Sequence, residues 1–546
     1  MPISESAASA QSVMSPDAPN RLWWEVATAL AVMLALPLSV TALPPMGDYP
    51  NHLARMFVIT QIHADPVLAK IYEVGWGMVP NLAMDLIVPP LSHLMPLDVA
   101  GRVFIALALL LPGVGVVAVH RVAFGGRSFW PLASALVCYN GLFFWGFLNF
   151  VAGMGLAMLG VALWLRGTER AGARGGWRFL LPISALAIAL FMCHAEALAL
   201  FGLTIGCTEL VRLWALRRAG ALSLPILAGR GLRLAAPFVV PALLFLFAAP
   251  LGESVAGRPM ALQIKEYYWA VHNAWQAGKL SGLGMPFAAY SPLVDGLAVA
   301  VIALVYGLQC LRHGCRTHPG LLLAAALLML VYPVVPSVWL TAANLDSRLP
   351  VFAMLLLFAG LAPKGETGPM VRTGALVFVA LLAVRAGVVG YTWARNTEDI
   401  AAFRRVIQTV EPGQRVALVS GADEAAKPPF RDWLFYDFKP GSLAPLLTID
   451  RRAFWPGLFT SRTLQPVHVR PAYRAIAVEQ SVMPADTALT APTEKDLLLN
   501  PYIGQWQQQF DYVLVWRPGE AHRGLLPDRL RWVDGAGIAA LYAVRR

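Results

Sequence analysis

Three side chains that can transfer protons or bind anions, Asp48, His52 and Arg55, lie within eight residues of one another. They directly follow the first long apolar segment, residues 22–43, which is long enough to cross a bilayer as a helix. Charged groups at that position are costly unless they have partners or a function. The stretch therefore predicts an active site embedded at the membrane surface rather than a simple anchor.

The spacing of these three residues predicts that they share one helical face. In a helix that begins at Tyr49, His52 and Arg55 follow Asp48 at i+4 and i+7. Asp48 is then a candidate acid–base residue, and His52 and Arg55 are candidate substrate contacts. Two alternatives stay open: Asp is a favoured helix N-cap, and the polar face of a surface helix is often only solvated.

Two further polar clusters lie where apolar segments end. His194 and Glu196 separate two apolar segments, and such groups need partners there; they are candidate contacts to substrate, and the alternative is a hairpin turn exposed to water. Asp346 and Arg348 precede another apolar segment. Arg is suited to a two-pronged grip on phosphate, and the alternative is an Asp346–Arg348 pair that orders the loop.

The remaining candidates lie in two longer connections. Lys265 and Tyr268 belong to a loop rich in aromatic residues, where rings can stack on sugars and Lys can meet phosphate; an interfacial aromatic belt is the alternative. Asp85 and His93 lie in the short apolar stretch 81–96 and are also candidate substrate contacts.

The composition is that of a polytopic membrane protein. Of 546 residues, 57% are hydrophobic and 14% are charged, against about 25% charged residues in soluble proteins. The net charge of +11 arises largely from Arg residues in short loops between apolar segments. That pattern follows the positive-inside rule and argues against nucleic acid as a partner.

Eleven apolar segments are long enough to be predicted as spans, and the basic loops alternate with mixed or uncharged ones. This parity places the N-terminus and basic loops in the cytoplasm and everything after Trp393 on the opposite side. The predicted spans are 22–43, 98–119, 129–147, 150–166, 179–195, 197–212, 234–250, 293–311, 319–338, 349–363 and 373–393.

Two regions before the second predicted span lie outside the spans. Residues 1–20 are expected to be disordered, ahead of a transmembrane module over 21–393. The first extracytoplasmic loop, 44–97, is expected to hold two helices in the membrane plane; the alternative is that 81–96 crosses the membrane and inverts the later loops.

The last 150 residues or so, 394–546, change in composition and predict a small extracytoplasmic α/β domain. An amphipathic helix is expected over 395–410. Strands are expected at 415–419, 510–516 and 538–544, where apolar β-formers follow turn residues.

An acidic residue after the first span, two surface helices and Ala100-Gly101-Arg102-Val103-Phe104 at the start of the second span together resemble the GT-C glycosyltransferases. That superfamily includes protein O-mannosyltransferases and aminoarabinose transferases. The resemblance implies that Asp48 is the catalytic acid–base or acceptor-positioning group. It also implies a polyprenyl-phosphate sugar donor, with a divalent cation, Mg²⁺ or Mn²⁺, as a possible cofactor.

These features together predict an inverting glycosyltransferase of a bacterial-type inner membrane. It would move a sugar to a lipid, polysaccharide or protein acceptor on the outer side. A base for the acceptor hydroxyl and cations for the departing phosphate suit that reaction. The alternative is a transporter or lipid flippase, a class that often shows repeated halves; no such repeat is found in the sequence.

Overall fold

The computed structural model describes residues 20–171, 177–248, 278–339, 342–364, 369–421, 441–461, 464–478, 483–519 and 524–546. Two of the candidate site residues, Lys265 and Tyr268, lie outside these ranges, as do residues 1–19 of the predicted disordered N-terminus.

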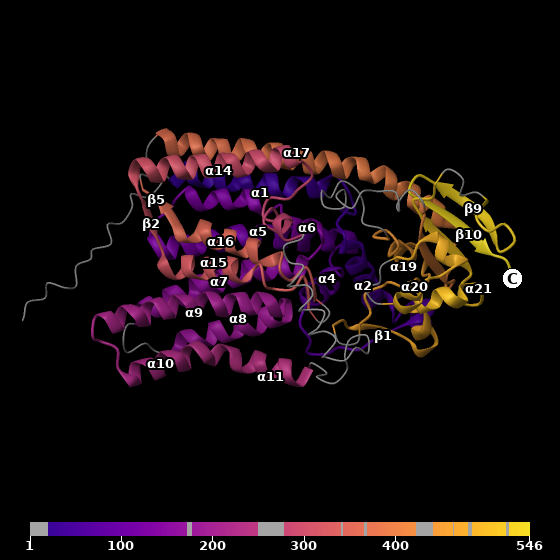
Figure 1. The fold of residues 1–546 in the computed structure, drawn as a ribbon, viewed down its shortest axis with the longest axis horizontal. Helices are drawn as coiled ribbons and strands as arrows, with labels where there is room; N and C mark the ends of the chain where they lie inside the picture. The colour runs from indigo at the N-terminus through magenta and orange to yellow at the C-terminus, as the bar shows by residue number, and fades with distance from the viewer. Residues whose placement is uncertain are drawn as a thin grey trace, which may run out of the picture.

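Long helices run side by side in a bundle, and the end of the chain forms a separate layer at one end of that bundle (Figure 1). Helices of the bundle are α1 (Asn20–Ala35), α5 (Leu97–Phe124), α7 (Leu148–Ala171), α8 (Leu180–Cys193), α9 (Ala195–Arg218), α10 (Leu224–Ala235), α11 (Val239–Ala248), α14 (Pro292–His313), α15 (Pro319–Val331), α16 (Arg348–Gly360) and α17 (Pro369–Val406). Shorter pieces join them: η1 (Leu36–Ser39), η2 (Trp130–Val137), α6 (Gly141–Phe144), η3 (Trp177–Phe179), η4 (Ala236–Phe238), α13 (Gly278–Gly282), β2 (Cys315–Thr317), β3 (Val338–Trp339), β4 (Ala342–Ala343) and β5 (Leu361–Pro363).

The chain is a multi-pass membrane protein. Within the described residues, seven helical segments are long and apolar enough to cross a membrane: Arg21–Ser39, Leu97–Phe124, Leu148–Glu169, Ala195–Arg218, Leu224–Phe247, Pro292–His313 and Val371–Thr409. Four shorter apolar helices accompany them, at Trp130–Phe144, Trp177–Cys193, Pro319–Val331 and Arg348–Gly360. Each of the eleven predicted spans overlaps one of these segments. Because four of the helices are short, the count of eleven crossings stays a prediction.

Helices α5 and α7 cross closely at the centre of the bundle. A Cβ atom at Gly115 would lie 2.5 Å from Met158 Cβ, and one at Gly155 would lie 2.4 Å from Leu111 Cβ. Small residues allow membrane helices to approach through their backbones. The two helices therefore form a tight pair that positions the loops at its ends.

The loop after α1 folds into four short elements: α2 (Tyr49–Gln61), α3 (Pro66–Ile71), β1 (Tyr72–Val74) and α4 (Ala83–Leu91). α4 has nine residues, and a helix of that length rises about 14 Å. It is too short for a hydrocarbon core of about 30 Å. This length favours the predicted short surface helix over the alternative in which residues 81–96 cross the membrane.

The C-terminal segment, defined here as the described part of residues 407–546, contains a four-stranded sheet in the order β6-β8-β10-β9. β6 pairs with β8 in parallel, and the other neighbours are antiparallel. Its elements are η6 (Ile407–Thr409), β6 (Val416–Ser420), α19 (Leu446–Arg451), β7 (Val467–Val469), η8 (Pro471–Ile476), η9 (Asp486–Leu489), α20 (Glu494–Leu499), η10 (Pro501–Gln505), α21 (Trp506–Gln509), β8 (Tyr512–Trp516), β9 (Leu530–Ala536) and β10 (Ala539–Val544).

The three predicted strands correspond to β6, β8 and β10, whose residues are almost all buried. β9 escapes prediction because it carries Asp534 and Gly535, which are depleted in strands. The predicted separate helix over 395–410 is instead mostly the end of α17, which continues through Trp393 without a Pro or Gly until Val406. The predicted domain bounds, 394–546, stay a prediction.

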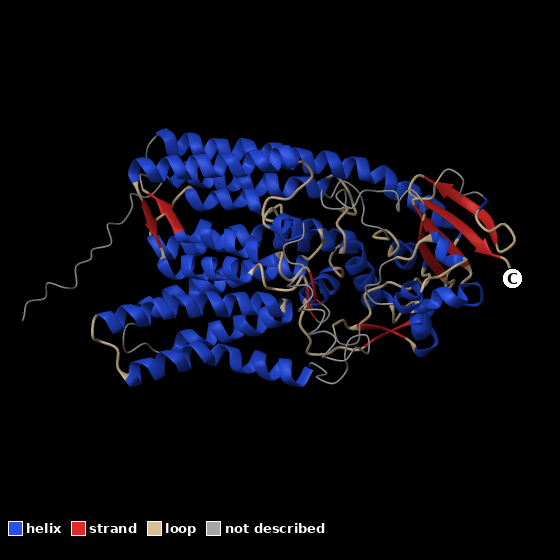
Figure 2. Ribbon diagram, viewed as in Figure 1, coloured by secondary structure: helices blue, strands red, loops and turns tan. Residues whose placement is uncertain are grey.

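Helix α17 and a strand pair are among the connections that join the C-terminal segment to the rest of the molecule (Figures 1 and 2). The 38 residues of α17 extend about 57 Å, well beyond a hydrocarbon core, and lead into the sheet. β7 pairs with β1, so that Val469 lies opposite Tyr72. The C-terminal segment therefore lies against the first loop, at the same end of the bundle.

Candidate active site

Asp48 lies where α1 gives way to α2, and the backbone on both sides of it is held. Its N–H donates to Trp145 O over 2.9 Å, and the N–H of Gly47 donates to Phe144 O over 3.0 Å. Asp48 occupies the N-cap position of α2, yet its side chain makes no capping hydrogen bond there. The half-buried carboxylate therefore does not cap α2. Helix capping was one of the alternatives to catalysis at this position.

The partner of Asp48 is the turn between α6 and α7, residues 145–147. Gly146 adopts φ +85°, a conformation that favours glycine. A Cβ atom there would lie 2.7 Å from the Asp48 nitrogen. A glycine at this position is thus required both by the turn and by the approach of the Asp48 backbone.

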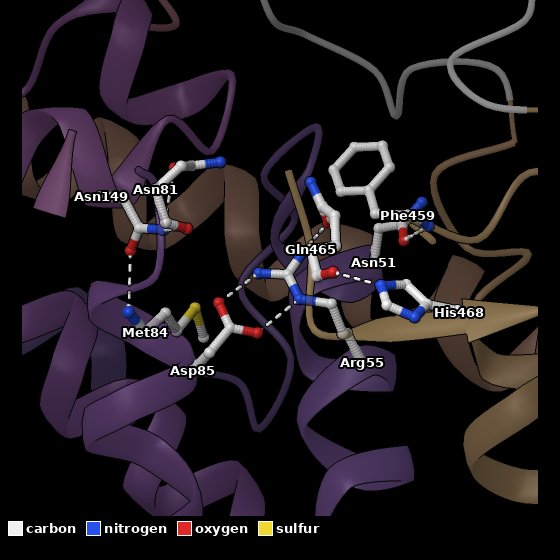
Figure 3. A network of polar contacts seen from close by, with 9 residues as sticks. All are labelled: Asn51, Arg55, Asn81, Met84, Asp85, Asn149, Phe459, Gln465 and His468. Atoms are coloured by element: carbon white, nitrogen blue, oxygen red, sulfur yellow. Dashed lines mark hydrogen bonds and ion pairs between the residues drawn. The ribbon is translucent and has the colours of Figure 1, made fainter. Parts of the chain in front are cut away.

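Arg55 and Asp85 form a buried ion pair between α2 and α4 (Figure 3). Arg55 Nε and Nη2 donate to the two Asp85 oxygens over 2.6 and 2.7 Å, and Nη1 donates to Gln465 Oε1 over 2.9 Å. Both charged side chains are almost fully buried. In the structure these two residues hold α2, α4 and the C-terminal segment together. Their contact with substrate stays a prediction. Removing one partner of such a pair costs about 3–5 kcal/mol, so single substitutions would report folding.

His52 lies against the C-terminal segment. Its ring meets Phe459 edge-to-face at 5.6 Å between centroids. The ring is buried, and its Nδ1 has no hydrogen-bond partner. Burial, aided by the Arg55 guanidinium, holds the pKa of His52 well below its ordinary value. His52 is therefore a neutral imidazole in the first turn of α2, and substrate contact by it stays a prediction.

Arg348 begins α16 and joins the second pair of predicted residues. Its Nη1 donates to Glu196 Oε2 and lies 3.2 Å from His194 Nε2. Phe147 and Phe150 lie on the guanidinium, each with a ring centroid 4.9 Å from Cζ. The structure thus brings together His194, Glu196 and Arg348, which the sequence places in two separate clusters up to 154 positions apart.

Asp346 is bound by side chains other than Arg348. Its carboxylate accepts from Lys279 Nζ and, over 2.9 Å, from Ser337 Oγ. The alternative in which Asp346 and Arg348 pair to order their loop is therefore not what the structure shows. Lys279, on α13, escaped the sequence analysis because it is an isolated cation far along the chain from Asp346.

Backbone and amide contacts bring these groups to one end of the bundle. Leu82 N–H donates to Met192 O over 2.7 Å, which joins the start of α4 to the end of α8 beside His194. Asn149 lies on α7, two residues after Phe147. Its side chain accepts from Met84 N–H and donates to Asn81 (Figure 3). His93 lies exposed in the turn after α4. Its contact with substrate stays a prediction.

The described part of the chain contains no group of side chains arranged to bind a metal ion. No three His, Cys, Asp or Glu side chains there gather into a group that could hold a metal ion. A divalent cation therefore stays a prediction of the resemblance, and no step proposed below depends on it.

The described structure combines a helix bundle, a carboxylate after its first helix, short helices in the first loop and a C-terminal segment against that loop. The fold is similar to that of ArnT from Cupriavidus metallidurans in its crystal structure bound to undecaprenyl phosphate. That likeness has a TM-score of 0.50 and 14% identity, and covers 95% of this chain and 98% of ArnT. The apo crystal structure of the same protein gives a TM-score of 0.42 and 17% identity, covering 95% and 97%.

The predicted GT-C resemblance is confirmed at the level of the fold. No protein-family model matches the sequence, and no curated protein sequence matches it.

Proposed function

We propose that this protein is a membrane glycosyltransferase that takes a sugar from a polyprenyl-phosphate donor. The observation that carries the proposal is the turn between α6 and α7. Trp145 of this turn binds the Asp48 backbone, and Phe147, two residues later, lies on the Arg348 guanidinium. A candidate base and a candidate phosphate ligand are thereby held at one end of the bundle by neighbouring residues.

The proposed reaction assigns one role to each of these groups. The Asp48 carboxylate accepts the proton of an acceptor hydroxyl as that oxygen attacks the anomeric carbon. The bond from the anomeric carbon to the donor phosphate breaks, and its electron pair leaves with the phosphate. Arg348, oriented by Glu196 and the two Phe rings, stabilises the charge that develops there. Attack opposite the leaving phosphate inverts the anomeric carbon.

The choice of donor is supported by the fold. The similar ArnT structure holds undecaprenyl phosphate, and a lipid-linked phosphate suits a cationic site at the mouth of a membrane bundle. The sugar is left open in this proposal, and the acceptor is a lipid, a polysaccharide or a protein. A bacterial-type inner membrane is the proposed location.

The proposed orientation places Asp48 and the C-terminal segment outside the cytoplasm, because the basic loops lie at the opposite helix ends. We expect a cysteine introduced at Thr397 or Glu398, both exposed positions of α17, to react with a membrane-impermeant maleimide added to intact spheroplasts. A cysteine placed at Ala219, after the basic end of α9, is the control and should react only after lysis. Reaction of the Ala219 position alone in intact spheroplasts would contradict the orientation.

The purified protein in proteoliposomes should transfer radiolabelled sugar from a polyprenyl-phosphate donor to an acceptor extract from an envelope fraction. The reaction should release one polyprenyl phosphate for each sugar transferred. A flippase would instead move the donor across the bilayer and leave it intact. Movement of intact donor without phosphate release would therefore favour the transporter alternative.

A further inference from the structure

Among the contacts between the C-terminal segment and α2, the helix whose N-cap is Asp48, a short loop supplies those to its first two turns. We call residues 457–461 and 464–465 the docking loop. Asn51 Nδ2 donates to Gly457 O over 3.0 Å, and Asn51 Oδ1 accepts from Phe459 N–H over 2.8 Å. Gln465 reaches Arg55 on the next turn of the same helix. Two successive turns of α2 are thus bound by residues more than 400 positions away.

The docking loop is itself held in place by the rest of the C-terminal segment. Gln465 N–H donates to Ser461 O over 2.9 Å, and His468 Nε2 lies 2.9 Å from Gln465 O (Figure 3). His468 belongs to β7, which pairs with β1. The side chain of Gln465 is therefore presented to Arg55 from a fixed backbone.

The first turn of α2 is fixed from two sides. The turn between α6 and α7 holds the Asp48 backbone from the membrane bundle, and His52 N–H donates to Asp48 O over 3.0 Å within α2. The docking loop holds the same turn from the C-terminal segment. The backbone that carries the Asp48 side chain is therefore adjacent to both contacts.

We propose that Asn51 and Gln465 are positioning residues, through which the C-terminal segment sets the geometry of Asp48 for sugar transfer. This inference rests on the proposed function and extends it, because it makes the C-terminal segment part of the catalytic apparatus. Displacements of about 1 Å at a reacting group can lower a rate by up to about a hundredfold. Loss of either contact should therefore lower turnover.

The test compares Asn51→Ala and Gln465→Ala with a matched variant, Arg470→Ala. Arg470 Nε also joins the C-terminal segment to the first loop, donating to Ala69 O over 2.7 Å, but it binds beyond α2. We expect Asn51→Ala and Gln465→Ala to lower kcat about ten- to a hundredfold, with donor KM changed by less than about threefold. Arg470→Ala should keep near wild-type kcat.

A rescue variant separates positioning from general damage. Gln465→Glu keeps an oxygen within reach of Arg55 Nη1, so it should restore most of the turnover that Gln465→Ala loses. Hydrogen exchange supplies a measurement that needs no activity. Amides of residues 49–55 should exchange faster in Asn51→Ala and Gln465→Ala than in the wild type, and at the wild-type rate in Arg470→Ala.

Each result has a definite meaning. If all three Ala variants lower only the unfolding midpoint, with kcat unchanged, the docking loop merely fastens two parts together and the inference is wrong. Unchanged exchange at residues 49–55 would also overturn it. Absence of transfer by the wild-type protein would instead remove the proposed glycosyltransferase function, while the exchange experiment still decides whether the docking loop controls α2.

Discussion

Replacing Asp48 by Asn should reduce sugar transfer by about a hundredfold or more, the scale of a lost general base. The substitution keeps the shape of the side chain, and the backbone bonds to Trp145 and His52 do not involve the carboxylate. Donor affinity and the unfolding midpoint should therefore stay close to wild type. Single-turnover transfer and donor binding, measured on one preparation, give both quantities.

A matched carboxylate is available at the same end of the bundle. Asp98, in the first turn of α5, makes a partly exposed i,i+4 pair with Arg102, and such pairs contribute little. Asp98→Asn should turn over sugar at close to the wild-type rate. Near wild-type transfer by a folded Asp48→Asn variant would remove Asp48 from the proposed mechanism.

Replacing Arg348 by Ala should raise the dissociation constant of the donor about ten- to a hundredfold, with a smaller effect on the acceptor. A charge-assisted bond to phosphate in a largely buried site contributes about 1.5–3 kcal/mol, which corresponds to roughly that change in affinity. Arg348→Lys should recover only part, because Lys lacks the planar two-pronged contact. Calorimetry with a polyprenyl-phosphate sugar measures these constants.

The structure shows why Arg348→Ala alone is ambiguous. Arg348 is 5% exposed and pairs with Glu196, so its removal leaves a buried carboxylate and lowers stability. Glu196→Gln breaks the same pair from the other side. If Arg348 binds phosphate, Glu196→Gln, which keeps the guanidinium but weakens the contact that orients it, should lower donor affinity less than Arg348→Ala does, while its unfolding midpoint also falls. Equal donor affinity in Arg348→Ala and wild type would transfer the phosphate role to His194 or Lys265.

The local sequence predicts where the site residues lie relative to the apolar helices. A carboxylate directly after an apolar segment of spanning length has to lie at the membrane surface, and α1 followed by the Asp48 turn follows that logic. The polar breaks at His194 and at Arg348 likewise come at the ends of apolar helices, at the end of the bundle where Asp48 lies. Strands β6, β8 and β10 were also predictable, because each is a short apolar run after turn residues.

The pairing of those residues was decided only by tertiary structure. Arg55, a predicted substrate contact, meets Asp85, 30 positions away, and Gln465, 410 positions away. Arg348 meets Glu196 rather than Asp346, which is bound by Lys279. Helical periodicity reports which residues share a face over a few turns. Helical periodicity does not tell which distant loop covers that face. The covering loop depends on how α5 and α7 cross and on where α17 places the C-terminal segment.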